Sequence, residues 1–566
     1  MKFQKTVFPL VLALSLLTGC AAAAPGSANT SGSATTVTAA SAAVSVSDGT
    51  SITFTDSGVT VSASGGVETE GTAVTVTESG TYLLSGSCAD GSVKVKKGTT
   101  GVTLVLNGLD LTANGTAPIV CGKSTEVTIL VNDGTENTLT DTAENNSETG
   151  NADGENAVIK CKDGSQVLLC GTGTLNIQAK GKNGIKSGAS IEETGDAFLT
   201  IRELTLNIDA PVNDAVNAEA VLNVESGTVT VSAGDDALHC DYTLNIGAEG
   251  TEGPTIRIQE CSEGLEGAAV NVYSGDISII AADDCINAAN ADLTNFSYQL
   301  NIFGGTIDAR SSTGDGFDSN GDLTISGGTV AVWTANTADN EPLDADGTVT
   351  ISGGTVLAAG GSSGMGLNLS AQQPCVIFGG DSGMGGQGQQ PGQMPGQSSQ
   401  SGQSTPPEMP TQSGQSTPPE MPTQSGQSTL PEMPSQSGTG TRPGQGGMNG
   451  GNSLLTEGGS FTLTASDGTV FYSGSAVYRA TFVLFSSDAL SDGDSCTLTC
   501  GDTQTAGTAA TGTVSTGMGG MGGPGGQRSN GTPPTGGFNG QTPGQKPDDS
   551  GSAPGQPTTS SGGTAA

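Results

Sequence analysis

The chain has 566 residues, of which 90 are Gly, 4% are aromatic and one is Trp. Large side chains are too scarce to fill a wide core, whereas abundant Gly, Thr and Val suit short strands joined by tight turns. The formal net charge of −38, from 56 acidic and 18 basic residues, excludes nucleic acid and anionic lipid as electrostatic partners and favours a soluble protein that attracts cations.

Residues 1–20 have the pattern of an export signal. Lys2 and Lys5 precede the apolar run "TVFPLVLALSLL", which ends in "LTGC" at Cys20. This ending resembles the bacterial lipoprotein signal, in which the Cys becomes the lipidated first residue of the mature protein. We therefore expect an extracellular protein held at the cell membrane by lipid on Cys20, with an ordinary signal peptide as the alternative. A second apolar run of about 18 residues is lacking, so we expect no spanning helix.

Composition divides the rest of the chain into tethers and ordered stretches. Residues 21–50, rich in Ala, Ser and Thr, predict a flexible tether. Residues 381–452, with their repeated "STPPEMPTQSGQ", and residues 506–566 bury too little apolar surface to fold, so we expect a disordered insertion and a disordered tail. Residues 51–380 form the main ordered stretch, and residues 453–505 predict strands that pack back on it.

A repeat of about 26 residues runs through the main stretch and is marked by an apolar residue in motifs such as "GIK" and "GFD". These apolar residues are Ile159, Ile185, Val216, Leu238, Leu265, Ile286, Phe317, Leu343 and Leu367. A second apolar series follows at Val224, Ile246, Val272, Ile302, Ile325 and Ile351. Each unit has three short strand-like pieces and no helical period. The pattern predicts an all-β, right-handed parallel β-helix with coils about 4.8 Å apart; paired β-sandwiches are the alternative.

A file of small residues lies two positions beyond the apolar residues. It comprises Cys121, Cys161, Ser187, Ala218, Cys240, Ala288, Ser319 and Ala345. Cysteine at such positions behaves as a small apolar residue, so we expect buried free thiols for the ten cysteines beyond Cys20. Disulfides are the alternative, because an exported chain can be oxidised.

An acidic residue stands two positions before the apolar residue in six consecutive units, and further acids follow the apolar residue. Stacked carboxylates repel and raise one another's pKa unless a cation neutralises them, and oxygen ligands alone suit Ca²⁺. The cysteines fall on another file, which argues against a thiolate metal site. We therefore expect calcium ligands among Asp214, Asp236, Glu263, Asp284, Asp315, Asp318, Glu341 and Asp344. A solvated acidic turn is the alternative.

Several stretches resemble a known family. They include "GTYLLSG" (80–86), "VTLVLNGLDLT" (102–112), "GTGTLNI" (171–177), "GDGFDSNGDLTISGGTV" (314–330) and "VLFSSDALSDGDSCTL" (483–498). The chain is similar in these stretches to a carbohydrate-binding parallel β-helix family of Gram-positive anaerobes, distantly related to polysaccharide and pectate lyases. The resemblance implies calcium along the coils and binding of cellulose-like or acidic, pectin-like polysaccharides without demonstrated cleavage.

The expected function is calcium-dependent, non-catalytic polysaccharide binding at the bacterial cell surface, by a monomer that meets the membrane only through its lipid. The sequence does not single out substrate-binding residues. One alternative is a calcium-dependent lyase of the pectate lyase type, with Lys160 or Lys186 as the base and Arg310 near the acids. A second alternative is a surface scaffold or adhesin.

Overall fold

The computed structural model describes residues 49–63, 65–191, 196–293, 296–335, 340–361, 367–379 and 453–515. The predictions for the signal peptide with Cys20, for the insertion and for most of the tether and tail lie outside these residues. The regular secondary structure of the described residues is almost entirely strand, and its one helical element is a 3₁₀ turn at Ser147–Thr149. Within the described ranges, no helix is both long and apolar enough to cross a membrane.

Two antiparallel hairpins open the ordered chain. They are formed by β1 (Thr50–Thr55) with β2 (Gly58–Val61) and by β3 (Val67–Glu70) with β4 (Ala73–Val76). β1 and β4 then pair in parallel with later strands, so the hairpins begin a 34-stranded sheet.

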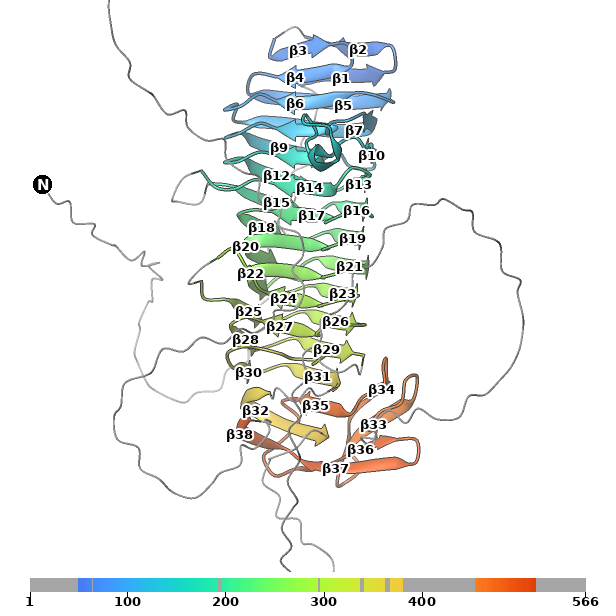
Figure 1. Cartoon of the computed structure of the whole chain (residues 1–566), viewed down its shortest axis with the longest axis vertical. Coiled ribbons are helices and arrows are strands. Elements are labelled where there is room, and N and C mark those ends of the chain that lie inside the picture. Colours follow the sequence, from blue (N-terminus) through green and yellow to red (C-terminus); the bar gives the residue numbers. More distant parts are fainter. Residues whose placement is uncertain are drawn as a thin grey trace, which may run out of the picture. The chain divides into compact units, whose positions relative to one another are not determined.

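Parallel strands make up most of this sheet. They begin with β5 (Gly80–Cys88), β6 (Ser92–Val95), β7 (Val102–Ala113), β8 (Ile119–Cys121), β9 (Glu126–Val131), β10 (Glu136–Asp141), β11 (Ala157–Cys161), β12 (Gln166–Gly171), β13 (Thr174–Gln178), β14 (Asn183–Ser187), β15 (Phe198–Arg202), β16 (Thr205–Ala210), β17 (Val216–Ala218), β18 (Val221–Val224) and β19 (Thr228–Ala233). They continue with β20 (Leu238–Ile246), β21 (Thr255–Glu260), β22 (Leu265–Val272), β23 (Asp276–Ala281), β24 (Ile286–Ala288), β25 (Gln299–Ile302), β26 (Thr306–Ser311), β27 (Phe317–Ser319), β28 (Asp322–Ile325), β29 (Thr329–Thr334), β30 (Val349–Ile351), β31 (Thr355–Gly360) and β32 (Asn368–Gly379). Most pair in parallel with a strand two or three places further along the chain, so the labelled strands form successive rows in Figure 1.

The pairing keeps the predicted repeat in register. Backbone partners link Ile159, Ile185, Val216, Leu238, Leu265, Ile286, Phe317 and Leu343 in that order. They also link Val224, Ile246, Val272, Ile302, Ile325 and Ile351. The all-β class, the stacking of the first apolar series from Ile159 to Leu343 and the stacking of the second series are therefore confirmed.

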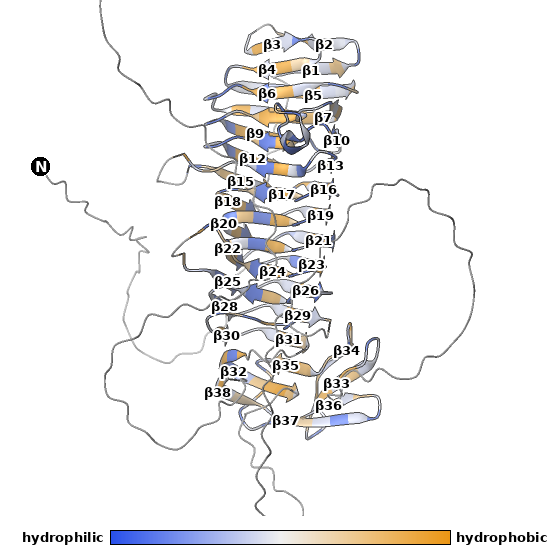
Figure 2. Ribbon diagram, in the orientation of Figure 1, coloured by the Kyte–Doolittle hydropathy of each residue, from blue (hydrophilic) through white to orange (hydrophobic). Residues whose placement is uncertain are grey.

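The two apolar series lie in one buried core. Burying each Ile, Leu or Val side chain stabilises the fold by about 1.5–3 kcal/mol relative to leaving it exposed. Medium-sized aliphatic side chains can fill this core because each row contributes only a few positions, so few aromatic residues are needed. Along single strands, Figure 2 shows hydrophobic and hydrophilic residues side by side, as alternation between a buried and an outward face requires.

The last strands cover the end of the parallel rows. They are β33 (Ser460–Ala465), β34 (Val470–Ser475), β35 (Phe482–Ser486), β36 (Ser495–Cys500), β37 (Thr503–Thr508) and β38 (Ala510–Ser515). β35 pairs antiparallel with both β31 and β32, and β38 pairs antiparallel with β32. The other four form a separate antiparallel sheet around a second core, in which Trp333 packs edge-on to Phe461.

One predicted boundary is wrong. Composition predicts a disordered tail from residue 506, yet β37 and β38 continue the ordered chain to Ser515. The segment is polar and rich in Gly and Thr, like the tail. Its strand is specified by pairing with the edge of β32 and by burial of Val514, neither of which shows in composition.

Three of the described cysteines, Cys121, Cys161 and Cys240, lie on the file of small residues, and the others are buried elsewhere. All ten that the structure describes are buried and free. Cys121 pairs with Cys161 across neighbouring strands, and Ser187, Ala218 and Cys240 pair in succession.

Candidate functional site

Six acids occupy equivalent positions in the turns before successive strands, and we name them the acid file: Asp214, Asp236, Glu263, Asp284, Asp315 and Glu341. One backbone hydrogen bond repeats between neighbouring coils. The residue after each acid donates its N–H to the carbonyl of the next acid in the file, at 2.9–3.2 Å. The file therefore runs continuously along the stacked turns.

Some carboxylates of the acid file also brace the coils. Oδ1 of Asp284 accepts the backbone N–H of Asp315 at 2.6 Å, and Oδ1 of Asp315 accepts that of Glu341 at 2.5 Å. Oδ1 of Asp214 accepts the backbone N–H of Asp236 at 3.3 Å. Each of these bonds uses one carboxylate oxygen and leaves the second for other partners.

Two clusters on the file offer only oxygen ligands. The Asp214 cluster contains Asp214, Asp235 and Asp236, and the Asp315 cluster contains Asp315, Asp318 and Asp344. In each, one carboxylate oxygen from every residue lies within 4.8 Å of the other two. Five of the eight predicted ligands thus come together.

The other three predicted ligands, Glu263, Asp284 and Glu341, stand on the same file. Within the described part of the chain, they belong to no three-residue cluster of this kind.

The environment disfavours the charged form of these carboxylates. Burial, with the neighbouring Asp236, raises the pKa of Asp214 to about 6, and burial also raises the pKa of Asp236 to about 6. Burial raises the pKa of Asp284 to about 8 and that of Asp315 to about 7. Burial and the nearby Asp344 raise the pKa of Asp318 to about 6. A bound cation would reverse these shifts, because it favours the ionised form.

Three buried oxygens beside the file have no hydrogen-bond donor among the described residues: Oδ1 of Asn217, Oδ1 of Asp236 and Oδ1 of Asn287. Hydrogen bonds fix the orientation of the two asparagine amides. The amide nitrogen of Asn217 donates to Asp214 at 2.6 Å, and that of Asn287 donates to Glu263 at 3.0 Å. An unsatisfied buried acceptor costs about 1–3 kcal/mol. Carboxylate and amide oxygens are the ligands that Ca²⁺ prefers, so the residues present fit this ion.

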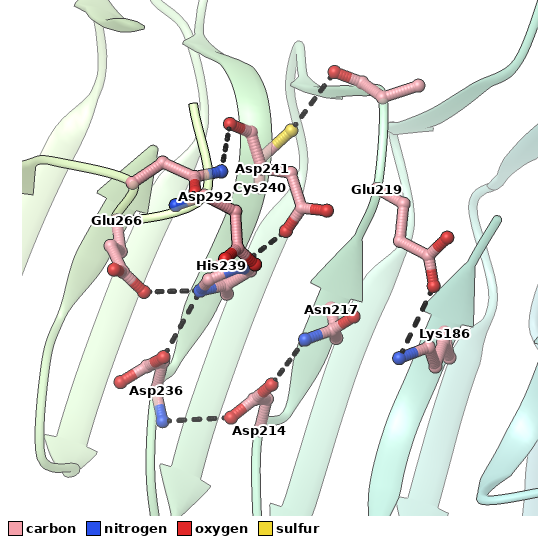
Figure 3. A network of polar contacts seen from close by, with 12 residues as sticks. Lys186, Asp214, Asn217, Glu219, Asp236, His239, Cys240, Asp241, Glu266 and Asp292 are labelled. Atoms are coloured by element: carbon pink, nitrogen blue, oxygen red, sulfur yellow. Dashed lines mark hydrogen bonds and ion pairs between the residues drawn. The ribbon is translucent and has the colours of Figure 1, made fainter. Parts of the chain in front are cut away.

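His239 lies beside the acid file and brings a cation from the protein itself (Figure 3). Its Nδ1 contacts Oδ2 of Asp236 at 3.2 Å and also Oε2 of Glu266, while Nε2 contacts Oδ1 of Asp241 at 2.9 Å. Burial alone would lower the pKa of His239, but the hydrogen bonds to these three carboxylates raise it well above its ordinary value. A doubly protonated imidazole has no lone pair for a metal, so this group fits a salt bridge better than a metal site.

Five further residues of these groups are not among the predicted ligands: Asn217, Asp235, His239, Glu266 and Asn287. Four of them occupy the position directly after the apolar residue of the repeat, so their alignment was visible in the sequence. The predicted ligands are all carboxylates, so the amides of Asn217 and Asn287 are not among them. Which amide oxygen lacks a donor depends on side-chain geometry that a spacing pattern does not contain.

The candidate bases of the lyase alternative lie on one file. Lys160 and Lys186 are backbone partners on neighbouring strands. The same series of partners continues from Lys186 to Asn217 and from Asn217 to His239. The ammonium of Lys186 meets Glu219 at 3.4 Å. Burial, together with Lys186, lowers the pKa of Lys160. Arg310 lies on β26, where its guanidinium binds both oxygens of Asp308, at 2.5 and 3.1 Å.

The fold and this file can be compared with known proteins. The family model of carbohydrate-binding domain-containing proteins matches residues 70–364 and 250–493. The chain belongs to this family. A carbohydrate-binding domain-containing protein of Acetivibrio thermocellus is 32% identical over 117 residues, which are 20% of this chain and 40% of that protein. The chain thus matches less than half the length of this relative.

The chain can also be aligned with a solved structure. It is a gadolinium derivative of the polysaccharide lyase-like protein from C. thermocellum. The two chains share 24% sequence identity with a TM-score of 0.30, over 54% of this chain and 92% of the other.

Proposed function

We propose that the protein binds polysaccharide through calcium ions held on the acid file, without cleaving it. One observation carries the proposal. Two clusters of carboxylates, the Asp214 and Asp315 clusters, lie on the acid file, and three buried side-chain oxygens beside this file have no hydrogen-bond donor among the described residues. Membership of the carbohydrate-binding family supplies the class of ligand.

Calcium would solve a charge problem for an acidic sugar. A protein with a formal net charge of −38 repels a uronate chain unless a cation lies between them. Ca²⁺ takes about 6–8 oxygen ligands, and three carboxylates of the Asp315 cluster leave positions for water or sugar oxygens. An ion held there would bridge protein and uronate carboxylates, so an acidic, pectin-like polymer suits this site.

Three further expectations form part of the proposal. Pairing of each strand with the strand two or three places later supports winding as a right-handed parallel β-helix of about 26 residues per coil. The "LTGC" sequence supports lipidation at Cys20 and a location at the cell surface. We propose that the protein acts there as a monomer.

Retention on polygalacturonate tests the metal site. Asp315→Asn with Asp318→Asn removes two charges from the Asp315 cluster, and Asp276→Asn with Asp308→Asn removes two charges from strands β23 and β26. We expect the first pair to weaken calcium-dependent retention about tenfold or more, because two metal ligands lose their charge. We expect the control pair to retain the polymer like the parent. Equal retention by both pairs would exclude the Asp315 cluster as the site.

One observation keeps a lyase reaction as a second candidate. Lys160, whose pKa is lowered, stands on a file that leads to the acid sites. Ultraviolet absorbance of unsaturated products during incubation with polygalacturonate and calcium measures cleavage. We expect none, and product formation that is lost in Lys160→Met would overturn the non-catalytic part of the proposal.

A further inference from the structure

A pair of stacked aromatic rings stands on a different set of turns from the acid file. Tyr273 and Phe303 follow β22 and β25, and their ring centroids are 5.0 Å apart with planes inclined by 13°. Val272 pairs with Ile302, so the rings occupy equivalent positions on neighbouring coils. Phe303 is 45% exposed and Tyr273 is half-buried. The stack therefore lies at the surface.

A cavity of about 270 Å³ adjoins the tyrosine end of this stack. Its lining includes Tyr273 with residues of the two preceding coils, Asn223, Glu225, Asn245, Gly247 and Glu249, whereas Phe303 takes no part. The cavity therefore lies on the side of Tyr273 away from Phe303. Its volume suits one ring-sized ligand rather than an extended one.

The position that would continue the aromatic stack is a glycine. Ile246 pairs with Val272, so Gly247 is the equivalent of Tyr273 one coil earlier. The backbone of Gly247 has a φ of +70°, and a Cβ there would lie 2.2 Å from Oγ of Ser274. The turn therefore excludes a side chain at this position. The space beside the Tyr273 ring stays open because no side chain can be placed there.

Asparagine amides supply fixed polar groups at the cavity. Asn271 donates to Asn245 at 3.0 Å, Asn245 to Asn223 at 2.9 Å, and Asn223 to Thr200 at 3.1 Å. Each amide nitrogen has two N–H groups, and this ladder uses one of each. The second N–H groups of Asn223 and Asn245 have no partner within the described ranges and are oriented by the ladder. Both residues line the cavity, so these N–H groups can donate to a ligand there.

We propose that this cavity binds one neutral hexopyranose unit of a polysaccharide, stacked on Tyr273. A pyranose has an apolar face of C–H groups and a rim of hydroxyls, which matches an aromatic ring beside amide donors and carboxylate acceptors. Glu225 and Glu249 line the cavity, and Arg202 pairs with Glu225 at 3.7 Å. Because the acidic side chains at this wall outnumber the basic one, a neutral sugar suits the cavity better than a uronate. The clusters that could hold a metal ion lie elsewhere among the described residues, on the acid file and its neighbours. The inference takes only the class of ligand from the proposed function.

Binding of cellohexaose, a neutral probe, measured by calorimetry on the full chain in calcium and in chelator, tests this site. We expect equal affinity in both buffers. Tyr273→Ala should weaken binding about tenfold or more, because it removes the central aromatic anchor, whereas Tyr273→Phe should retain it. Ala248→Phe, an exposed position at the cavity, should block binding without disturbing the core, and it replaces Tyr273→Ala if that variant does not fold.

The outcomes separate this site from the calcium site. Tyr273→Ala should leave calcium-dependent retention on polygalacturonate unchanged, and Asp315→Asn with Asp318→Asn should leave cellohexaose binding unchanged. Lack of cellohexaose binding by the parent would overturn the hexopyranose site while leaving the calcium proposal standing. Binding as tight as the parent's by both Tyr273→Ala and Ala248→Phe would do the same. Lack of calcium-dependent polygalacturonate retention by the parent, with cellohexaose binding intact, would overturn only the calcium proposal.

Discussion

At the scale of single residues, the acid file needs positive charge or bound protons to be stable. Buried carboxylates at neighbouring positions repel, and water is too scarce around them to screen the repulsion. At one coil the chain supplies the charge itself, as the imidazole of His239 between Asp236, Asp241 and Glu266. At the Asp315 cluster, the neighbouring charges that act on Asp315 and Asp318 are all acidic within the described residues, so that cluster depends on protons or on a metal ion.

Replacement of His239 tests its role as an internal cation. His239→Gln leaves three carboxylates facing one another, so we expect the free energy of unfolding at pH 7 to fall by about 3 kcal/mol. The raised pKa keeps the stabilisation present at acidic and neutral pH, and it is lost as the pH rises through the folded-state pKa. Urea denaturation of both proteins at neutral and alkaline pH measures the difference.

Arg202→Gln is the control, because it removes the half-exposed ion pair with Glu225. An exposed pair contributes about 1 kcal/mol or less. If His239→Gln costs no more than Arg202→Gln, the imidazole is not the counter-charge of this group.

The pKa values of the acid file predict how the chelated protein responds to pH. Asp284, Asp315 and Asp318 titrate in the folded state at about 8, about 7 and about 6, and an unfolded Asp titrates near about 3.9. Between about pH 4 and pH 8 the folded chain holds protons that the unfolded chain has released, so stability falls as the pH rises. In chelator we expect a lower Tm at pH 8 than at pH 5.

Calcium should remove this difference by raising the Tm more at pH 8, because ionised ligands bind the ion without first losing protons. Calorimetric scans at both pH values, with calcium and with chelator, measure the effect. A Tm in chelator that does not change with pH would show that the carboxylates are not held in their protonated form.

At the scale of strands and turns, the sequence predicted those features that recur in every coil. Parallel neighbours align equivalent residues, so spacing alone placed Ile185 beside Val216 and put Asp236 and Glu263 on one file. It did not reveal the antiparallel β1–β2 hairpin or β38, because these depend on the edges that they cover. The cavity beside Tyr273 was also hidden, since the turn lengths around Gly247 decide which residues meet there.

The cysteine positions give a prediction at this scale. All ten described cysteines are buried, and burial raises the pKa of Cys240 and Cys375 to about 11 and that of Cys261 to about 12. Thiolates are the reactive form, so we expect the folded Cys20→Ser chain not to react with an aromatic disulfide reagent at neutral pH. Unfolding in denaturant should release all ten thiols. A smaller number after unfolding would indicate disulfides, and rapid reaction of the folded chain would contradict the burial.

At the scale of the whole molecule, the ends of the parallel rows are covered by antiparallel strands. An uncovered sheet edge presents unpaired backbone groups and invites aggregation. β1 to β4 cover one end, and β35 and β38 cover the other. The covering strands β35 and β38 follow residues 381–452 in the sequence, so the chain must return to β31 and β32 after that long segment.

The two ends of that segment meet, which predicts that it can be shortened. Gly379 pairs with Phe482, and a Cβ built on Gly379 would lie 2.9 Å from a methyl carbon of Leu454. Replacing residues 381–452 by a short Gly/Ser linker should preserve the fold. Each halving of a flexible loop lowers the closure cost by about 0.6 kcal/mol, so the free energy of unfolding should stay the same or rise by up to about 2 kcal/mol.

Truncation after Thr508 is the contrasting variant, because it removes β38 and leaves the edge of β32 unpaired. We expect it to lower the Tm and to aggregate on concentration, as measured by calorimetry and light scattering. If the shortened chain were as destabilised as the truncated one, residues 381–452 would have to contribute to folding, and the covering strands would not by themselves hold the end of the sheet. Unchanged stability of the truncated chain would show instead that β35 alone closes this end.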